Sequence, residues 1–155
     1  MNVESMYEEK STSALEYLSK SGLRVTAARR SLVGLLAEAD RPLSVEEISE
    51  RSDGRFDLVT VYRNMDVFIE LGVAQSIQLE NGKALYELSD SDGHHHHHIV
   101  CRSCHKVERI DFCMGGELER FASQKGYSSL KHTIEVFGLC PICDDGGDAV
   151  AMAKA

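Results

Sequence analysis

The sequence predicts an α+β fold in which an N-terminal winged helix-turn-helix is followed by a small α/β domain. Three observations predict it. Amphipathic helical runs occupy most of the chain up to Gly72, the pair Asn81-Gly82 then marks a hairpin, and two Cys-x-x-Cys pairs enclose short strand-like runs in the second half. Each half is small for a stable core, so we expect a structural metal and dimerisation to contribute stability.

The composition is that of a soluble globular protein. The chain has 155 residues, enough for one ordinary domain or two small ones. Hydrophobic residues make up 43% and charged residues 27%, and no apolar run is long enough to cross a bilayer. The N-terminus lacks the pattern of a secretory signal, so we expect a cytoplasmic protein with no membrane partner. The five cysteines are then better interpreted as metal ligands or redox thiols than as a disulfide framework.

Four helices are expected before the hairpin. A short first helix covers residues 13–20. Thr26 is a candidate N-cap for the second, over the run AARRSLVGLLAEA, whose leucines share one face. Ser44 and Glu47 form a capping box at the start of the third, and Asp57 is a candidate N-cap for the fourth, LVTVYRNMDVFIELG.

The hairpin completes the first domain. Residues 73–79 and 84–88 are β-like runs on either side of Asn81-Gly82, a strong hairpin signal. Helices followed by such a hairpin predict a winged helix-turn-helix over residues 1–88.

The second domain is expected over residues 94–145, after a polar hinge at 89–93. Its expected elements are three strands and one helix, over residues 98–101, 106–112, 132–139 and 117–126. Leu118 and Phe121 form an apolar stripe that we expect in the core. The tail, 146–155, is expected to be disordered.

The charge distribution bears on nucleic-acid binding. A net charge of -8 argues against a protein that coats nucleic acid through charge alone. From Lys20 to Arg63, however, eight basic residues stand against seven acidic ones. A sequence-specific DNA binder is therefore compatible with this composition.

The two Cys-x-x-Cys pairs are the strongest chemical signal. Cys101 and Cys104 are separated by thirty-five residues from Cys140 and Cys143. This pattern is typical of a tetrahedral four-cysteine zinc site, which leaves no position for water and is therefore structural. The alternative is two redox-active or merely buried pairs.

A run of five histidines, 94–98, is the second signal. It is internal, unlike a terminal purification tag. Side chains alternate along a strand, so His96 and His98 share one face while His95 and His97 share the other, and the run can serve two metal sites. The alternative is a solvated low-complexity tract that collects metal adventitiously. Imidazole suits zinc, iron, nickel and copper alike.

The fourth helix carries polar groups outside its apolar stripe. Thr60, Tyr62, Arg63 and Asn64 offer a hydroxyl, a phenol, a guanidinium and an amide. Such groups contact phosphates and base edges in DNA complexes. The alternative is an ordinary solvated helix face.

These motifs occur in an order that resembles the ferric uptake regulator family, over residues 20–143. The segments are GLRVTAARR, ADRPLSVEEI, LVTVYRNMDVFIELGVA, NGKALYEL, HHHHHIVCRSCHKVE and HTIEVFGLCPIC. The resemblance implies a homodimeric repressor, not an enzyme, that binds double-stranded operator DNA and takes no small-molecule substrate. It implies DNA contacts from Tyr62 and Arg63, a minor-groove contact from Arg24, and structural zinc on the four paired cysteines.

The resemblance also implies a regulatory metal site at the hinge. The family's ligand pattern maps onto Glu87, His96 and His98. A fourth ligand, often a histidine, falls on Pro42, which cannot bind metal. The His run and HTIEVFG look most like zinc uptake regulators, so zinc is favoured over iron or manganese as the second metal.

An additional site is implied within the second domain. Its ligands map onto His95, His97 and His132, but the helix glutamate of the family falls on Gly115. Glu117 is the nearest replacement, with Asp111 or Glu108 as others. The fifth cysteine, Cys113, is interpreted as a buried small side chain, a spare ligand or a redox handle.

The leading hypothesis is a metal-dependent transcriptional repressor, with control of zinc uptake favoured. Metal at the hinge would select the orientation in which both recognition helices match adjacent major grooves. The alternatives are an iron- or peroxide-responsive repressor of the same family, a zinc-buffering protein, and a metal hydrolase with Glu108 as general base.

Overall fold

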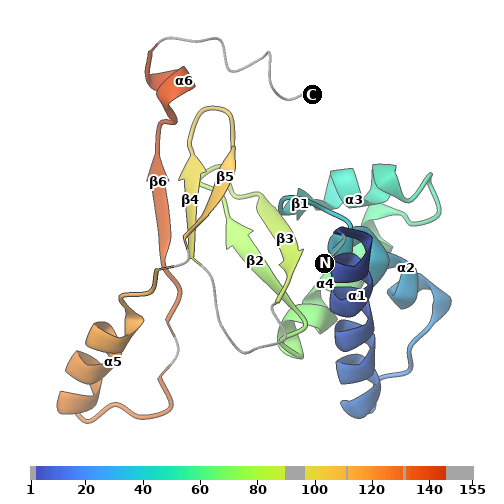
Figure 1. Cartoon of the computed structure of the whole chain (residues 1–155), viewed down its shortest axis with the longest axis horizontal. Coiled ribbons are helices and arrows are strands. Elements are labelled where there is room, and N and C mark those ends of the chain that lie inside the picture. Colours follow the sequence, from blue (N-terminus) through green and yellow to red (C-terminus); the bar gives the residue numbers. More distant parts are fainter. Residues whose placement is uncertain (1–2, 90–96, 111, 131, 146–155) are drawn as a thin grey trace. The chain divides into compact units, whose positions relative to one another are not determined.

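The computed structural model describes residues 3–89, 97–110, 112–130 and 132–145. The chain divides into two units, Met1–His95 and His96–Ala155. Figure 1 shows the helices of the first unit and the strands of both. Most of the predicted hinge and the whole predicted tail lie outside the described residues. No described helix is both long and apolar enough to span a bilayer.

The first helix, α1 (Val3–Lys20), is much longer than predicted. We expected it over residues 13–20, but it begins at Val3, and its first half carries too few apolar residues to give a helical stripe. Its C-terminal half packs against the next helix through Leu18, which is fully buried, and Gly22 leaves the helix with a φ of +78° (Figure 1). A φ in this region favours glycine.

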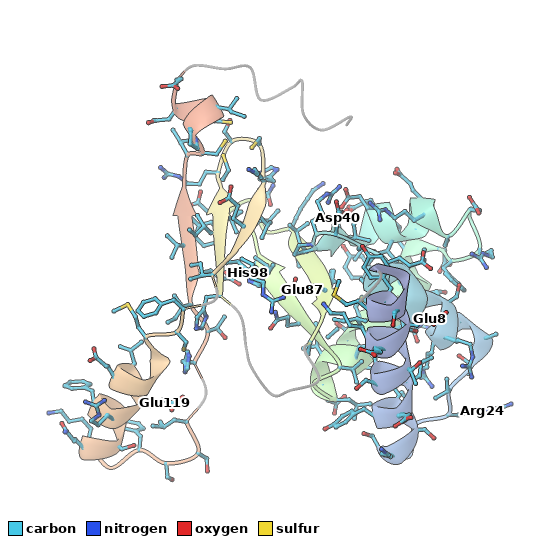
Figure 2. The ribbon with its side chains drawn as sticks, viewed as in Figure 1. Glu8, Arg24, Asp40, Glu87, His98 and Glu119 are labelled. Atoms are coloured by element: carbon cyan, nitrogen blue, oxygen red, sulfur yellow. The ribbon has the colours of Figure 1, made fainter. Side chains whose placement is uncertain are left out.

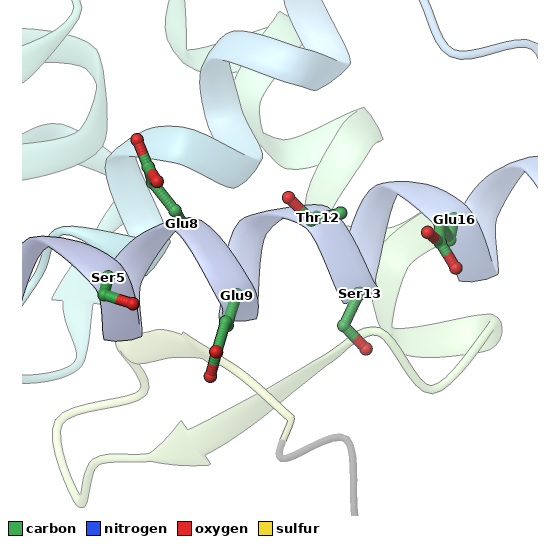
Figure 3. A pocket seen from close by; sticks show the side chains of 6 residues that line it. All are labelled: Ser5, Glu8, Glu9, Thr12, Ser13 and Glu16. Carbon is green, nitrogen blue, oxygen red and sulfur yellow. The ribbon is translucent and has the colours of Figure 1, made fainter. Parts of the chain in front are cut away.

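One face of α1 is hydrophilic and acidic. Figure 3 shows its side chains lining a shallow hollow: Ser5, Glu8, Glu9, Thr12, Ser13 and Glu16. Carboxylates repel the phosphates of nucleic acid. This face of α1 is therefore unsuited to contact a DNA backbone.

The three predicted N-caps are confirmed. They begin α2 (Ala27–Ala37), α3 (Val45–Arg51) and α4 (Leu58–Glu70). The Thr26 hydroxyl and the Asp57 carboxylate each accept a backbone N–H three residues on, at 3.3 and 2.8 Å. Ser44 and Glu47 form a complete capping box. Each cap satisfies amide groups that a helix start would otherwise leave unpaired.

The first sheet contains the predicted hairpin and one strand that was not predicted. β2 (Ala74–Gln78) pairs antiparallel with β3 (Ala84–Leu88), and the two-residue β1 (Leu43–Ser44) pairs with the other edge of β3, in the order β1-β3-β2. Two residues are too few to give a strand pattern. The sheet and helices enclose one apolar cluster, which includes Leu32, Ile48, Met65 and Phe68.

The second unit is built on a mixed sheet in the order β5-β4-β6. Its strands are β4 (His97–Cys101), β5 (Val107–Ile110) and β6 (Glu135–Gly138). β4 pairs antiparallel with β5 and parallel with β6, and the parallel pair is connected through α5 (Gly115–Gln124). The last helix is α6 (Pro141–Asp144). The strands β5 and β6 are shorter than the predicted runs, 106–112 and 132–139.

The predicted core role of Leu118 and Phe121 is wrong for the single chain. These side chains are 54% and 62% exposed, and Gly115 is the buried residue of α5. The apolar stripe on α5 is real, but nothing described in the chain covers it. Side chains of this kind usually face a partner when they are exposed as a group.

Candidate metal centres and nucleic-acid interface

The four paired cysteines meet at one end of the second sheet. Cys101 ends β4, and Cys140 lies two residues after β6. β4 and β6 are parallel neighbours, with Cys101 in register with Gly138, so both strands lead their cysteine pairs to the same end. The four sulfur atoms all lie within 4.8 Å of one another.

The sulfur spacing fits a tetrahedral zinc ion. The Sγ atoms of Cys104 and Cys140 are 3.8 Å apart. Zn–S bonds of about 2.3 Å in a tetrahedron place neighbouring sulfurs about 3.8 Å apart. The chemistry of the donors fits as well, because zinc favours thiolates and four of them complete its coordination. The structure confirms that the four predicted cysteines form one cluster.

Local hydrogen bonds prepare part of this cluster for metal. Burial raises the pKa of Cys101, but backbone N–H groups, foremost those of Cys104 and Cys140, outweigh it and lower the pKa to about 6. For Cys143, a side-chain hydrogen bond with Ser103 lowers the pKa, but Cys140 and the other thiols raise it to about 12. Because zinc binds thiolates, a bound ion would displace the protons that remain on these sulfur atoms.

A second donor cluster joins His97, Cys113 and His132. Their ligand atoms also lie within 4.8 Å of one another. The Cys113 sulfur is 3.1 Å from Nε2 of His97 and 3.2 Å from Nε2 of His132. His97 is on β4, Cys113 precedes α5 and His132 precedes β6, so three separate segments converge here.

The structure brings a different carboxylate to this cluster from the predicted one. Oε1 of Glu119, labelled in Figure 2, lies 2.9 Å from Nδ1 of His132, whereas the Cys113 sulfur lies near the other ring nitrogen, Nε2. Glu117 is exposed and is not in the donor cluster. His95 and Asp111 lie outside the described residues. Only the interpretation of Cys113 as a spare ligand anticipated its place here, and its interpretation as a buried side chain is wrong, because Cys113 is exposed.

The predicted regulatory ligands are distributed over both units. Glu87 lies on β3 and accepts a hydrogen bond from the side-chain amide of Gln75. His98 is buried on β4, and both residues are labelled in Figure 2. His96 lies outside the described residues. Pro42 is buried immediately before β1. The ligand set Glu87, His96 and His98 stays a prediction.

Helix α4 presents Tyr62 and Arg63 to solvent, as a DNA-reading helix requires. Tyr62 is 46% exposed and Arg63 is exposed as well. At the start of the same helix, Leu58 and Val59 are also exposed, which sequence patterning did not single out. Apolar side chains in this position suit contact with thymine methyl groups.

Asn64 faces its own protein instead. Its amide nitrogen donates to the Thr60 carbonyl at 2.7 Å, and its oxygen accepts from Nε of Arg29 at 3.3 Å. Arg29 also donates to the Arg24 carbonyl at 2.7 Å. These bonds connect α4 to α2 and to the segment before α2 that carries the exposed Arg24. Arg24 is labelled in Figure 2. Arg29 is thus a positioning residue that the sequence did not reveal, because its partners are distant in sequence.

Comparisons with known proteins agree with this architecture. The model of the ferric uptake regulator family matches residues 20–137. The ferric uptake regulation protein of Staphylococcus aureus is 28% identical over 135 residues, which cover 85% of this chain and 96% of that protein.

Solved structures show the same fold. The ferric uptake regulator of Vibrio cholerae has a TM-score of 0.66 and 27% identity, covering 81% of this chain and 98% of that one. A zinc uptake regulator solved with zinc and DNA shares the fold, with a TM-score of 0.66 and 22% identity over 90% of this chain and 96% of that one. Motifs, fold and similarity agree, and the chain belongs to the ferric uptake regulator family of metal-responsive transcriptional regulators.

Proposed function

We propose that this protein is a zinc-responsive, homodimeric repressor that binds operator DNA in the cytoplasm and controls zinc uptake. The observation that carries the proposal is that the two units present different groups. The first unit exposes Tyr62 and Arg63 on a capped helix, and the second unit holds two clusters of sulfur and nitrogen donors.

The four-cysteine cluster is the structural zinc site of this proposal. Its donors would be Cys101, Cys104, Cys140 and Cys143, and a bound zinc ion would fix the end of β4 to the start of α6. Among the described residues of the second unit, few are buried, Val100 and Cys101 among the apolar ones. Metal binding energy at such a site is folding energy, so this zinc would offset the small core.

A regulatory metal acts through the link between the units. Glu87 belongs to the first unit, whereas His96 and His98 belong to the second. A metal bound by all three would restrict the orientations that the units sample. In a dimer, the retained orientation would place two α4 helices at the spacing of adjacent major grooves on a partly palindromic operator.

We favour zinc as the regulatory metal because the histidine run and HTIEVFG look most like zinc uptake regulators, one of which, solved with zinc and DNA, shares the fold. Imidazole donors suit zinc and iron alike. An iron-responsive repressor is the second candidate, supported by the name of the Staphylococcus aureus relative. A zinc-buffering role would not account for the exposed side chains of α4, Tyr62 and Arg63.

A second copy of the chain would cover exposed apolar side chains of the second unit. Ile99 on β4 is in register with Val136 on β6, and both are exposed, at 43% and 45%. Leu118 and Phe121 on α5 add to this apolar surface. Homodimer interfaces are more apolar than ordinary protein surface, which these residues suit.

Selection of genomic fragments tests the proposal. The full chain is incubated with sheared DNA from its own host in the presence of zinc, ferrous iron or manganese, and bound fragments are sequenced. We expect enrichment of a partly palindromic, AT-rich site with zinc, and none with the Arg63→Ala variant. Enrichment with iron alone would favour the second candidate, and no enrichment with any metal would contradict both.

A further inference from the structure

We propose that Cys113 is a metal ligand and that, with His97 and His132, it forms an N2S site for zinc in the second unit. The proposal rests on the proposed function in that it gives this zinc-binding regulator a further site, separate from the four-cysteine site and from the proposed regulatory site at Glu87, His96 and His98. It departs from the family pattern, which places a helix glutamate where this chain has Gly115.

The three donor atoms already converge. Nε2 of His97 and Nε2 of His132 lie 3.1 and 3.2 Å from the Cys113 sulfur. In a tetrahedral zinc site, with Zn–N of about 2.05 Å and Zn–S of about 2.3 Å, such atoms are about 3.5 Å apart. A small outward movement of each donor would therefore admit the ion between them.

The surrounding groups hold these donors in the required orientation. The backbone N–H of Gly115 donates to the Cys113 sulfur at 3.1 Å. Glu119 contacts Nδ1 of His132 at 2.9 Å and leaves Nε2 directed at the sulfur. A carboxylate on the far nitrogen of a ligating imidazole is the usual outer support of a zinc site, because it fixes the tautomer and the ring orientation.

Gly115 makes room for this arrangement. A methyl group at its Cα would overlap the imidazole ring of His132, whereas one at Gly116 would meet nothing within 4 Å. Gly115 does not have a left-handed φ, so space rather than backbone conformation requires glycine here. A glutamate at this position would therefore displace His132. The absence of the family carboxylate at Gly115 and the presence of the Cys113 thiol therefore belong to one change in the set of ligands.

The chemistry of the donors determines which ions the site accepts. One thiolate and two imidazoles favour zinc and cobalt over manganese and ferrous iron, which prefer oxygen donors. Three protein ligands leave one tetrahedral position for water or a further donor. His97 is 2% exposed whereas Cys113 is exposed, so that position can open toward solvent on the side of the sulfur.

Cobalt absorption tests the site directly. The full chain, holding one zinc per protomer at the four cysteines, is titrated with Co²⁺. We expect near-ultraviolet thiolate-to-cobalt charge-transfer absorption whose final intensity corresponds to one thiolate-bound cobalt per chain, and which is reversed by zinc and resists manganese. Cys113→Ser should lose this absorption and keep its structural zinc. Absence of the band in the parent chain, or its full retention in Cys113→Ser, would overturn the proposal.

Two glycine variants give a matched control. Gly115→Ala should lose the cobalt signal because it displaces His132, while Gly116→Ala should bind cobalt like the parent. Glu119→Gln should keep the charge-transfer band but weaken cobalt binding by about tenfold or more. Equal cobalt affinity in Gly115→Ala and Gly116→Ala would contradict the geometric argument.

Alkylation provides a second readout that does not depend on cobalt. Iodoacetamide should modify Cys113 in the chain with only its structural zinc, and added zinc should protect it, as followed by peptide mass spectrometry. Equal modification with and without zinc would count against the site. These readouts do not involve DNA, so a failure of zinc-dependent DNA binding would overturn the proposed function alone.

Discussion

At the scale of single residues, neighbouring side chains on α4 have different surroundings. Tyr62 and Arg63 extend into solvent, whereas Asn64 bonds to Thr60 and Arg29. The sequence placed all of these polar residues outside the apolar stripe, and it could not separate the exposed side chains from the one that bonds within the protein. That separation depends on Arg29, which lies 35 positions away along the chain.

The exposed pair on α4 carries the first prediction. Arg63→Ala and Tyr62→Ala should each abolish specific operator binding at working concentrations, since one lost base-edge contact costs about 1–3 kcal/mol. Electrophoretic mobility shift with the selected operator measures this loss. Zinc content and dimer mass should not change. If both variants shift the operator as well as the parent does, α4 is not the reading helix.

The four-cysteine cluster carries the second prediction. Cys104→Ser should reduce bound zinc by about one ion per chain and impair folding or dimerisation, because metal binding and folding are coupled at such a site. Elemental analysis and light scattering measure the two effects. A Cys104→Ser chain that lacks this zinc and yet unfolds at the parent's temperature would contradict the structural assignment.

At the scale of elements, local rules predicted helix starts well. The caps at Thr26, Ser44 and Asp57 depend on residues three positions apart, which a sequence shows directly. The start of α1 and the strand β1 were missed because packing and pairing with distant segments define them. The stripe on α5 was identified, but its burial was not, since burial depends on what covers the stripe.

The capping box of α3 carries the third prediction. Ser44→Ala should destabilise the first unit by about 1 kcal/mol, because it removes the acceptor for the Glu47 backbone N–H. Urea unfolding of the full chain, followed by helical circular dichroism, measures the change. Ser44→Thr keeps a hydroxyl acceptor and should retain most of the stability. Equal unfolding midpoints for Ser44→Ala and the parent would contradict the capping role.

The same box carries a fourth prediction, on pH. Burial raises the pKa of Glu47, but bonds from Arg41 and from the Ser44 backbone N–H outweigh it, so the pKa is lowered. The contribution of Glu47 to stability is then complete above the ordinary glutamate pKa and is lost as the pH falls through its lowered value. The stability difference between the parent and Glu47→Gln should therefore shrink on acidification. A difference that grows toward low pH would contradict this sign.

At the scale of the whole molecule, the sequence indicated more of the chemistry than of the geometry. The two Cys-x-x-Cys pairs predicted the four-cysteine site because the ligands of each pair are close together in the sequence. For the second cluster, the family resemblance placed His97 and His132 in one site, but it did not assign Cys113 to that site, since the three residues come from segments that only the fold brings together. The inference that Cys113 takes the place of the family carboxylate depends on the position of His132 beside Gly115, which the sequence does not show.

The central claim is that a metal at the hinge controls DNA binding. Glu87 and His98 lie in different units, so a metal that bound both would restrict the orientations of the units, whereas the cluster around His97 lies within the second unit alone. The two faces of the histidine run should therefore respond differently when they are altered.

Operator affinity as a function of free zinc, measured by fluorescence anisotropy, tests this claim most directly. The parent, His96→Ala and His95→Ala are compared, each holding its four-cysteine zinc. We predict that affinity rises steeply with zinc in the parent, stays flat in His96→Ala, and rises at a shifted zinc concentration in His95→Ala. Zinc-independent operator binding by the parent, or equal losses in both variants, would contradict the account.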